Sequence, residues 1–194
     1  MSDPALLAAL DQRRSTPSLQ LGEPGPDRAT LLRMLRSAVR VPDHGKLVPF
    51  RFLAIEGDAH RALGEALAAR ALERDPHAPA AALDKDRARF AHAPLALAVV
   101  ARLHPDNPKV PEIEQWMTAG SVCFALLQAA QALGFGAQWL TGWAAFDRGI
   151  ARTLGLDENE HVAGFVHIGT PKIEVPERER PDPAALLATW RPHA

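Results

Sequence analysis

The spacing of apolar residues predicts two helices near the N-terminus. In the region 27–41, apolar side chains fall at i, i+1, i+4, i+7 and i+8, the period of a helix with one buried face, and Asp27 is its predicted N-cap. A similar repeat of leucines predicts a shorter helix over residues 4–13. The stretch 17–26 between them is rich in Pro and Gly, which predicts an irregular loop.

Three further segments have the pattern of largely buried strands. Phe50–Glu56 follows a proline and alternates its side chains between two faces, and Leu95–Ala101 is almost continuously apolar. Val162–Ile168 has the same character and ends at a Gly-Thr-Pro turn. A short strand is also predicted near Gln138–Leu140.

The remaining apolar repeats predict helices. The longest runs from about Pro111, which suits a first helical turn, to Leu133, just before Gly134 as a C-terminal stop. The other helices are predicted over 58–74, over 80–92 and from about Phe146 to Leu154.

These elements predict an α+β fold. Strands and helices are interspersed without regular alternation, which argues against a doubly wound parallel sheet. The length of 194 residues suits a single domain over 1–194 that buries its core without disulfides or metals. The Pro-rich tail after Pro171 carries one apolar cluster, Leu186, Leu187 and Trp190, which we expect to dock on a neighbouring subunit.

Charge and hydropathy exclude some classes of partner. The chain has 22 basic and 23 acidic residues and a net charge of −1, so no overall positive field attracts nucleic acid or an anionic membrane surface. The most apolar stretch, Ala119 to Ala137, is interrupted by Gln128 and Gln131, which predicts a buried helix and no membrane span. The N-terminus has no recognisable export signal, so we expect a cytoplasmic location.

Side chains that do chemistry by themselves are scarce. The chain lacks the signatures of serine hydrolases, zinc proteases and phosphate-binding loops, and no two of its eight histidines have the spacing of a metal site on one helix. The single cysteine, Cys123, lies in an apolar run and is interpreted as a core residue. A bound cofactor would explain this scarcity, because the cofactor carries the chemistry while the protein binds and orients it.

The first candidate binding segment lies at the end of the N-terminal helix. Arg13, Arg14 and Ser15 bring together two guanidinium groups and a hydroxyl, which can hold a phosphate or a polyol through charge-assisted bonds. An arginine pair at a helix end is also a common solvated feature, favoured by the helix dipole. Taken alone, this segment leaves both interpretations open.

The second candidate segment is the loop before the first long strand. Pro42 and Pro49 constrain this loop, and Arg40, His44 and Lys46 place cationic or donor groups along it. A proline turn with solvated charges explains the same residues equally well.

The third candidate segment follows a glycine-rich turn. Trp139, with Trp143 four residues later, offers a flat apolar wall beside Leu140, and Thr141 and Gly142 offer hydrogen-bond donors. The alternative is a helix-to-strand turn with core tryptophans.

A fourth segment, Gly164–Pro171, is a buried strand that ends in a turn, and we interpret His167 within it as a hydrogen-bonded strand histidine. In this order the four segments resemble the nitroreductase family of FMN enzymes, most closely its small bacterial members. The shared patterns are Arg-Arg-Ser, R-x-P-D-H…P-[WF]-x-F, G-F-G-x-x-W-x-[ST]-G and G-F-x-x-x-G-T-P, and together they span nearly the whole chain.

The resemblance implies a central, mostly antiparallel sheet flanked by helices, in an intertwined homodimer with FMN at the subunit interface. By the same resemblance, Arg13, Arg14 and Ser15 would hold the ribityl phosphate and the pyrimidine side of the flavin. Arg40 and His44 would reach that flavin from the other subunit.

The resemblance also implies the reaction. Trp139, Leu140 and Thr141 would border the isoalloxazine ring, with the backbone of Gly142 as a donor to its redox-active nitrogen. NADH or NADPH would reduce the flavin, and a nitroaromatic, quinone or similar acceptor would then take the electrons in a ping-pong sequence. No side chain is expected to be catalytic, and no metal is expected.

Some points stay open. Phe50 stands where the family commonly has tryptophan, and the roles of Lys46, Arg178 and Arg180 toward the phosphate are undecided. Relatives of this fold also fragment flavin or dehalogenate aromatic substrates, so a different flavin reaction is an alternative. A non-catalytic flavin-binding regulatory dimer and a helical domain without cofactor are the others.

Overall fold

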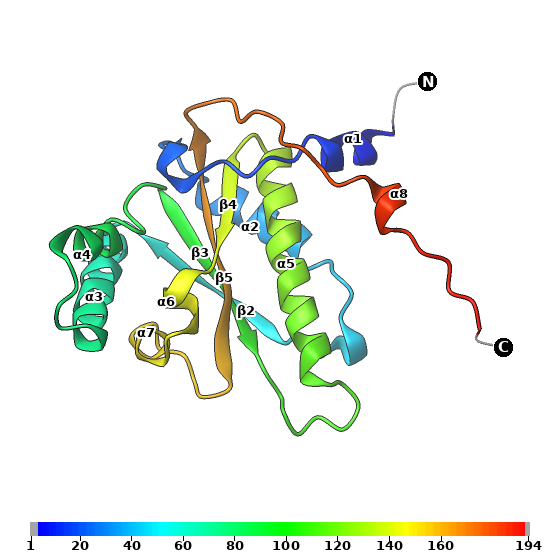
Figure 1. Cartoon of the computed structure of the whole chain (residues 1–194). Coiled ribbons are helices and arrows are strands. Elements are labelled where there is room, and N and C mark those ends of the chain that lie inside the picture. Colours follow the sequence, from blue (N-terminus) through cyan, green and yellow to red (C-terminus); the bar gives the residue numbers. More distant parts are fainter. Residues whose placement is uncertain (1–3, 193–194) are drawn as a thin grey trace.

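The computed structural model of the chain describes residues 4–192, in which helices cover both faces of an antiparallel sheet (Figure 1). The first three residues, part of the N-terminus in which no export signal was recognised, lie outside the described residues. The last two residues of the Pro-rich tail also lie outside them. The predicted α+β class, with a mostly antiparallel sheet, is confirmed.

The sheet is organised around one long strand. The strands are β1 (Leu21–Gly22), β2 (Phe50–Glu56), β3 (Leu95–Arg102), β4 (Gly136–Leu140) and β5 (Glu160–Pro171). Their order is β1-β5-β3-β2, β4 also pairs with β5, and every pairing is antiparallel. The 12 residues of β5 pair with three strands: residues 160–168 with β3, residues 165–169 with β4 and residues 170–171 with β1.

Helices divide between the two faces. They are α1 (Ala5–Asp11), α2 (Arg28–Ala38), α3 (Asp58–Arg74), α4 (Ala80–Arg87), α5 (Glu112–Ala132), α6 (Gly142–Phe146), α7 (Arg148–Thr153) and α8 (Pro183–Leu186), with 3-10 turns at Ser18–Gln20 and His44–Lys46. Helices α2 and α5 pack on one face, and α3, α6 and α7 pack on the other.

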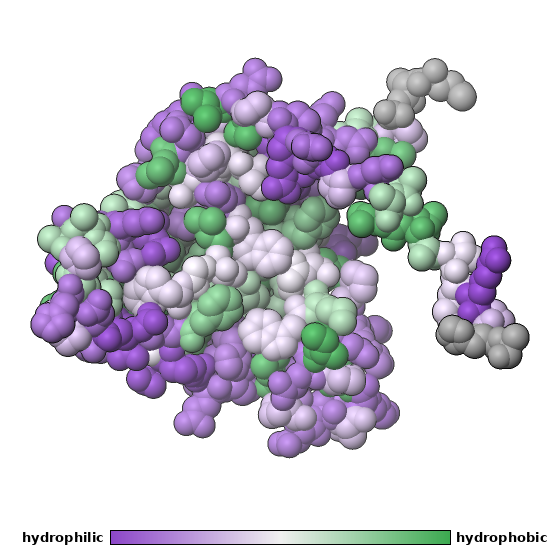
Figure 2. All heavy atoms as spheres, viewed as in Figure 1, coloured by the Kyte–Doolittle hydropathy of each residue, from purple (hydrophilic) through white to green (hydrophobic). Residues whose placement is uncertain are grey.

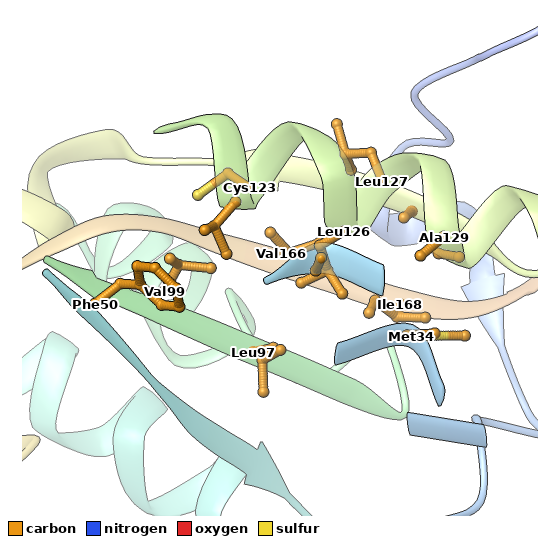
Figure 3. Packing of buried hydrophobic residues seen from close by; sticks show 14 of the residues in the cluster. Met34, Phe50, Leu97, Val99, Cys123, Leu126, Leu127, Ala129, Val166 and Ile168 are labelled. Carbon is orange, nitrogen blue, oxygen red and sulfur yellow. The ribbon is translucent and has the colours of Figure 1, made fainter. Parts of the chain in front are cut away.

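Side chains that alternate along the central strands build the two cores. On β3, the odd-numbered apolar residues such as Leu97 and Val99 face α5, and the even-numbered ones face α3. Figure 3 shows Leu126 and Cys123 of α5 packed over these strands. The core interpretation of Cys123 is confirmed, and burial raises the pKa of its thiol to about 12.

The predicted boundaries of the main helices are close to those observed. Asp27 caps α2 by accepting a 2.7 Å hydrogen bond from the Thr30 amide. Helix α5 begins at Glu112, directly after Pro111, and ends before Gly134, whose φ of +83° is available to glycine at little cost.

Other segments differ from the prediction. The 17–26 loop contains strand β1, which forms only because β5 offers it a partner. The single helix predicted near 146–154 is two helices, since Asp147 accepts a bond from the Ile150 amide and starts α7. Helix α4 ends at Arg87, not near residue 92, and the following turn buries Phe90. The tail contains the short helix α8, while Leu186, Leu187 and Trp190 are exposed.

Replacing Leu126 with alanine should lower the free energy of unfolding by about 2 to 5 kcal/mol, because the side chain is fully buried and its removal leaves a cavity between α5 and the sheet. Urea denaturation measures this loss. Leu72→Ala on α3 is the matched control, since that leucine is 45% exposed and the change should cost much less. Equal losses in the two variants would contradict the burial of Leu126 between α5 and the sheet.

Candidate functional site

The segment after α1 is fixed against the C-terminal end of α5 and against β4. The Arg14 amide donates to Gln131 Oε1 at 3.0 Å, and the Thr16 amide donates to the Ala137 carbonyl at 3.0 Å. Arg13 Nη1 donates to Ser15 Oγ at 3.0 Å. These contacts bring two of the predicted segments, residues 13–15 and the start of β4, to the same edge of the molecule.

The C-terminal tail adds charges to this edge. Glu177 forms an ion pair with Arg14, and its Oε1 lies 3.0 Å from Arg180 Nη2. Partial burial lowers the pKa of Arg13, and the positive charges of Arg180, Arg178 and Arg14 lower it further. Arg178 and Arg180, whose roles sequence left undecided, therefore lie close enough to act on Arg13. The result is a cluster of four guanidinium groups with Glu177 as counter-ion, which is suited to an anion.

The β4–α6 turn places the other predicted ring-bordering residues. Trp139 Nε1 donates to the Ala163 carbonyl at 3.2 Å, and its indole lies so close over β5 that a Cβ at Gly164 would collide with it. Gly142 has a φ of +61°, a conformation that favours glycine. Leu140 and Thr141 connect Trp139 to this glycine and are half-buried.

Sequence analysis missed a polar cluster behind this turn. Asp86 Oδ1 accepts hydrogen bonds from Arg89 Nη2 at 2.6 Å and from Trp143 Nε1 at 3.1 Å. A Cβ on Gly142 would lie 3.1 Å from Arg89 Nη1, so the guanidinium is beside the predicted site. In sequence, an aspartate and an arginine three residues apart on a helix have the spacing of an ordinary surface pair, so no signal distinguished them. Trp143 faces this cluster, in agreement with the core alternative for that residue.

The loop that carries Arg40 and His44 lies at the other end of α5. His44 Nδ1 is 2.6 Å from Glu114 Oε2, and Thr118 Oγ1 donates to the Pro42 carbonyl at 3.3 Å. Lys46 and Val48 have positive φ values of 54° and 50°, so the loop holds a costly backbone conformation. Strained backbone of this kind occurs most often at functional sites.

One chain does not bring the two halves of the predicted site together. Glu114, which binds the loop, and Gln131, which binds the arginine segment, are 17 residues apart on α5. At 1.5 Å per residue this separation is about 25 Å. Arg40 and His44 are therefore remote from Arg13, Arg14 and Ser15 of the same chain.

A hollow of about 420 Å³ lies next to the arginine segment. It is lined by Arg14, by Gln131 and by Pro171 at the end of β5. Arg13, Thr141 and Gly142 do not line it. The hollow is thus adjacent to the predicted site without coinciding with it. Within residues 4–192, no group of three or more His, Cys, Asp or Glu side chains is placed to hold a metal ion. Among the helices described, none is both long and apolar enough to cross a membrane.

A comparison with family models decides which family these features belong to. The model described as the Nitroreductase family matches residues 10–170. The chain belongs to the nitroreductase family. The match includes the arginine segment and all of β5 except its last residue, Pro171, so the sequence resemblance is confirmed.

Individual relatives support the same assignment to the nitroreductase family. The Escherichia coli (strain K12) protein named "Putative NAD(P)H nitroreductase YdjA" is 34% identical over 182 residues, which are 93% of this chain and 97% of that protein. The structure of a nitroreductase-like family protein from Bacillus cereus has a TM-score of 0.81 at 16% identity and covers 97% of both chains. A variant of the FMN- and NADPH-dependent nitroreductase NfnB from Sphigopyxis sp. strain HMH has a TM-score of 0.73 at 19% identity, covering 98% of this chain and all of that one.

The surroundings of the His167 side chain differ from those that the sequence predicted. The sequence suggested a hydrogen-bonded strand histidine, but within residues 4–192 the buried Nδ1 has no hydrogen-bond partner. The ring stacks on Phe90 at 5.4 Å, in the apolar layer on the α3 face of the sheet. Burial lowers the pKa of His167 to about 4, and the nearby charges of His60, Arg89 and His92 act in the same direction.

The pKa of His167 predicts a loss of stability in acid. With a pKa of about 4 in the folded chain and about 6.5 in the unfolded chain, the unfolded chain binds more protons as the pH falls below 6.5. The free energy of unfolding should thus decrease by about 2 kcal/mol from this group between pH 7.5 and pH 5. Urea denaturation at the two pH values, compared with His167→Gln, isolates the effect.

The variant should lose less stability than the parent between these pH values. His77→Gln, at an exposed histidine, is the control and should keep the full decrease. An identical decrease in the parent and in His167→Gln would show that His167 does not titrate as its burial requires.

Proposed function

We propose that this chain is an FMN-dependent oxidoreductase that takes electrons from NADH or NADPH and passes them to a nitroaromatic, quinone or similar acceptor. The observation that carries the proposal is the cluster of Arg13, Arg14, Arg178 and Arg180 on the edge where β4 begins, the strand that leads to the turn at Gly142. Membership of the nitroreductase family supports the same class of reaction.

The residues present suit the two parts of FMN. A phosphate needs directed cationic donors, and the arginine cluster offers four guanidinium groups, two of which pair with Glu177. A planar ring needs close approach of backbone, and Gly142 provides a turn without a side chain. Thr141 and Gly142 would offer backbone donors there, with Trp139 and Leu140 at the border of the ring.

The chain contributes binding and electrostatics to the reaction. Bound FMN supplies the hydride and electron transfer that no side chain here supplies. Arg89 would favour negative charge next to the β4–α6 turn, and Arg13 would favour it near the start of β4, because preorganised cations stabilise charge without rearranging. The nicotinamide donor and the acceptor would use the same face in turn, which gives ping-pong kinetics.

We also propose that the working form is a homodimer, because the halves of the site lie at opposite ends of α5. Pairing α5 antiparallel with its copy about a two-fold axis would place Arg40 and His44 of one subunit near Arg13 of the other. The outer face of α5 suits this pairing, since Met117 and Phe124 are 59% and 45% exposed. In Figure 2, apolar and weakly polar residues gather over α5, β4 and α6, with hydrophilic residues around them.

The purified protein should show the visible absorption bands of oxidised flavin, and these bands should bleach when NADH or NADPH is added without oxygen. A visible spectrum before and after addition is the measurement. Bands that persist with both nucleotides would indicate a flavin-binding protein with another electron source. A protein that stays colourless after FMN is supplied would contradict the proposal.

Mixed dimers test whether each site needs two subunits. Arg13→Ala and His44→Ala should each impair both sites of their own homodimer. A hybrid of the two variants regains one intact site, so co-refolding equal amounts should restore about a quarter of the parent rate if subunits pair at random. Nitroaromatic-dependent NADPH oxidation measures this rate. Differently tagged Arg13→Ala chains, mixed in the same way, are the control, and a mixture no faster than its parents would indicate sites within single subunits.

A further inference from the structure

Asp86 is a carboxylate buried in a surface helix. It is 7% exposed, whereas Asp84 on the same helix is exposed and pairs with Arg87. A buried carboxylate is costly unless it is paired and hydrogen-bonded. Asp86 meets both conditions with one oxygen, because Oδ1 accepts from Arg89 Nη2, from Arg89 Nε at 3.2 Å and from Trp143 Nε1.

These bonds give the Arg89 guanidinium one orientation. Nε and Nη2 are directed at Asp86, and Nη1 remains outside this contact on the side of Gly142. A guanidinium is planar, so fixing two of its nitrogens determines the direction of the third. The carboxylate thus determines where Arg89 presents its remaining donors.

The same carboxylate fixes the chain next to Gly142. Trp143 follows Gly142 directly and lies in the first turn of α6, and its indole donates to Asp86 across the gap between α6 and α4. On α3, the Arg74 guanidinium lies 4.9 Å from the centre of the same indole ring. Asp86 therefore binds both Arg89, the cation beside Gly142, and Trp143, the residue that follows Gly142 in the turn.

We propose that Asp86 is a positioning residue for the flavin site, which acts by holding Arg89 beside Gly142 so that the guanidinium meets the charge of the reduced cofactor. This inference rests on the proposed function, because Gly142 borders the flavin only if FMN binds at the β4–α6 turn. Asp86 itself would touch neither cofactor nor substrate, and its effect would pass through Arg89.

A double-mutant cycle on FMN affinity tests the inference. Asp86→Asn and Arg89→Gln, each introduced alone into the full chain, should raise the Kd for FMN about tenfold, the effect of losing one charge-assisted hydrogen bond. In the Arg89→Gln background, Asp86→Asn should change the Kd less than twofold, because there is no guanidinium left to position. Fluorescence titration of FMN with the apoprotein measures each value.

The matched control is Asp84→Asn, which removes the same charge from an exposed position of α4 and should leave the Kd unchanged. An equal loss of affinity from Asp86→Asn in both backgrounds would overturn the inference, since Asp86 would then act independently of Arg89. No loss in either background would overturn it as well. If the asparagine variant does not fold, Asp86→Glu, which keeps the charge and moves the carboxylate by one methylene, is used in the same cycle.

The flavin midpoint potential is a second readout that a structural role would not move. Arg89→Gln and Asp86→Asn should both shift it to more negative values, because the reduced anion loses its guanidinium partner. A shift to more positive values in Asp86→Asn would mean that Arg89 stays in place and Asp86 contributes only its charge, which contradicts positioning. A parent protein that takes up no FMN would instead refute the proposed function itself.

Discussion

The packing of α5 on the sheet is the interaction on which the rest of the candidate site depends. Leu126 and Val122 lie fully buried over β3 and β5, and burial of each such side chain contributes about 2 kcal/mol. A helix held along its length by such contacts acts as a rigid spacer. Gln131 near one end fixes the arginine segment and Glu114 near the other fixes the His44 loop, so the separation of these two segments follows from the helix geometry.

The same helix has a second apolar face that its own chain leaves exposed. Met117 and Phe124 lie on this face, with the small residues Gly120 and Ser121 between them, so another helix can approach closely at its middle. A contiguous apolar surface of this kind is characteristic of an interaction site. One helix thereby serves the core with one face and, in the proposed dimer, completes the cofactor site with the other.

Much of this architecture can be predicted from local patterns, because the responsible signals are local. The long helix before Gly134 and the apolar strand Leu95–Ala101 have the periodicity and end signals that their burial requires. The missed features depend on contacts between distant residues. Strand β1 exists because β5 offers a free edge, and Arg89 matters because the chain folds Gly142 against it, 53 positions later in the sequence. No spacing rule within α4 reports such a contact.

A site divided between two subunits has a thermodynamic consequence for this chain. If FMN contacts Arg13 of one subunit and His44 of its partner, the free energy of binding is available in full only to the dimer. By mass action FMN must then stabilise the dimer, and dilution toward monomers must weaken the affinity for FMN. In that case the exposed face of α5 and the divided cofactor site have one explanation: association of the subunits through α5 assembles the flavin site.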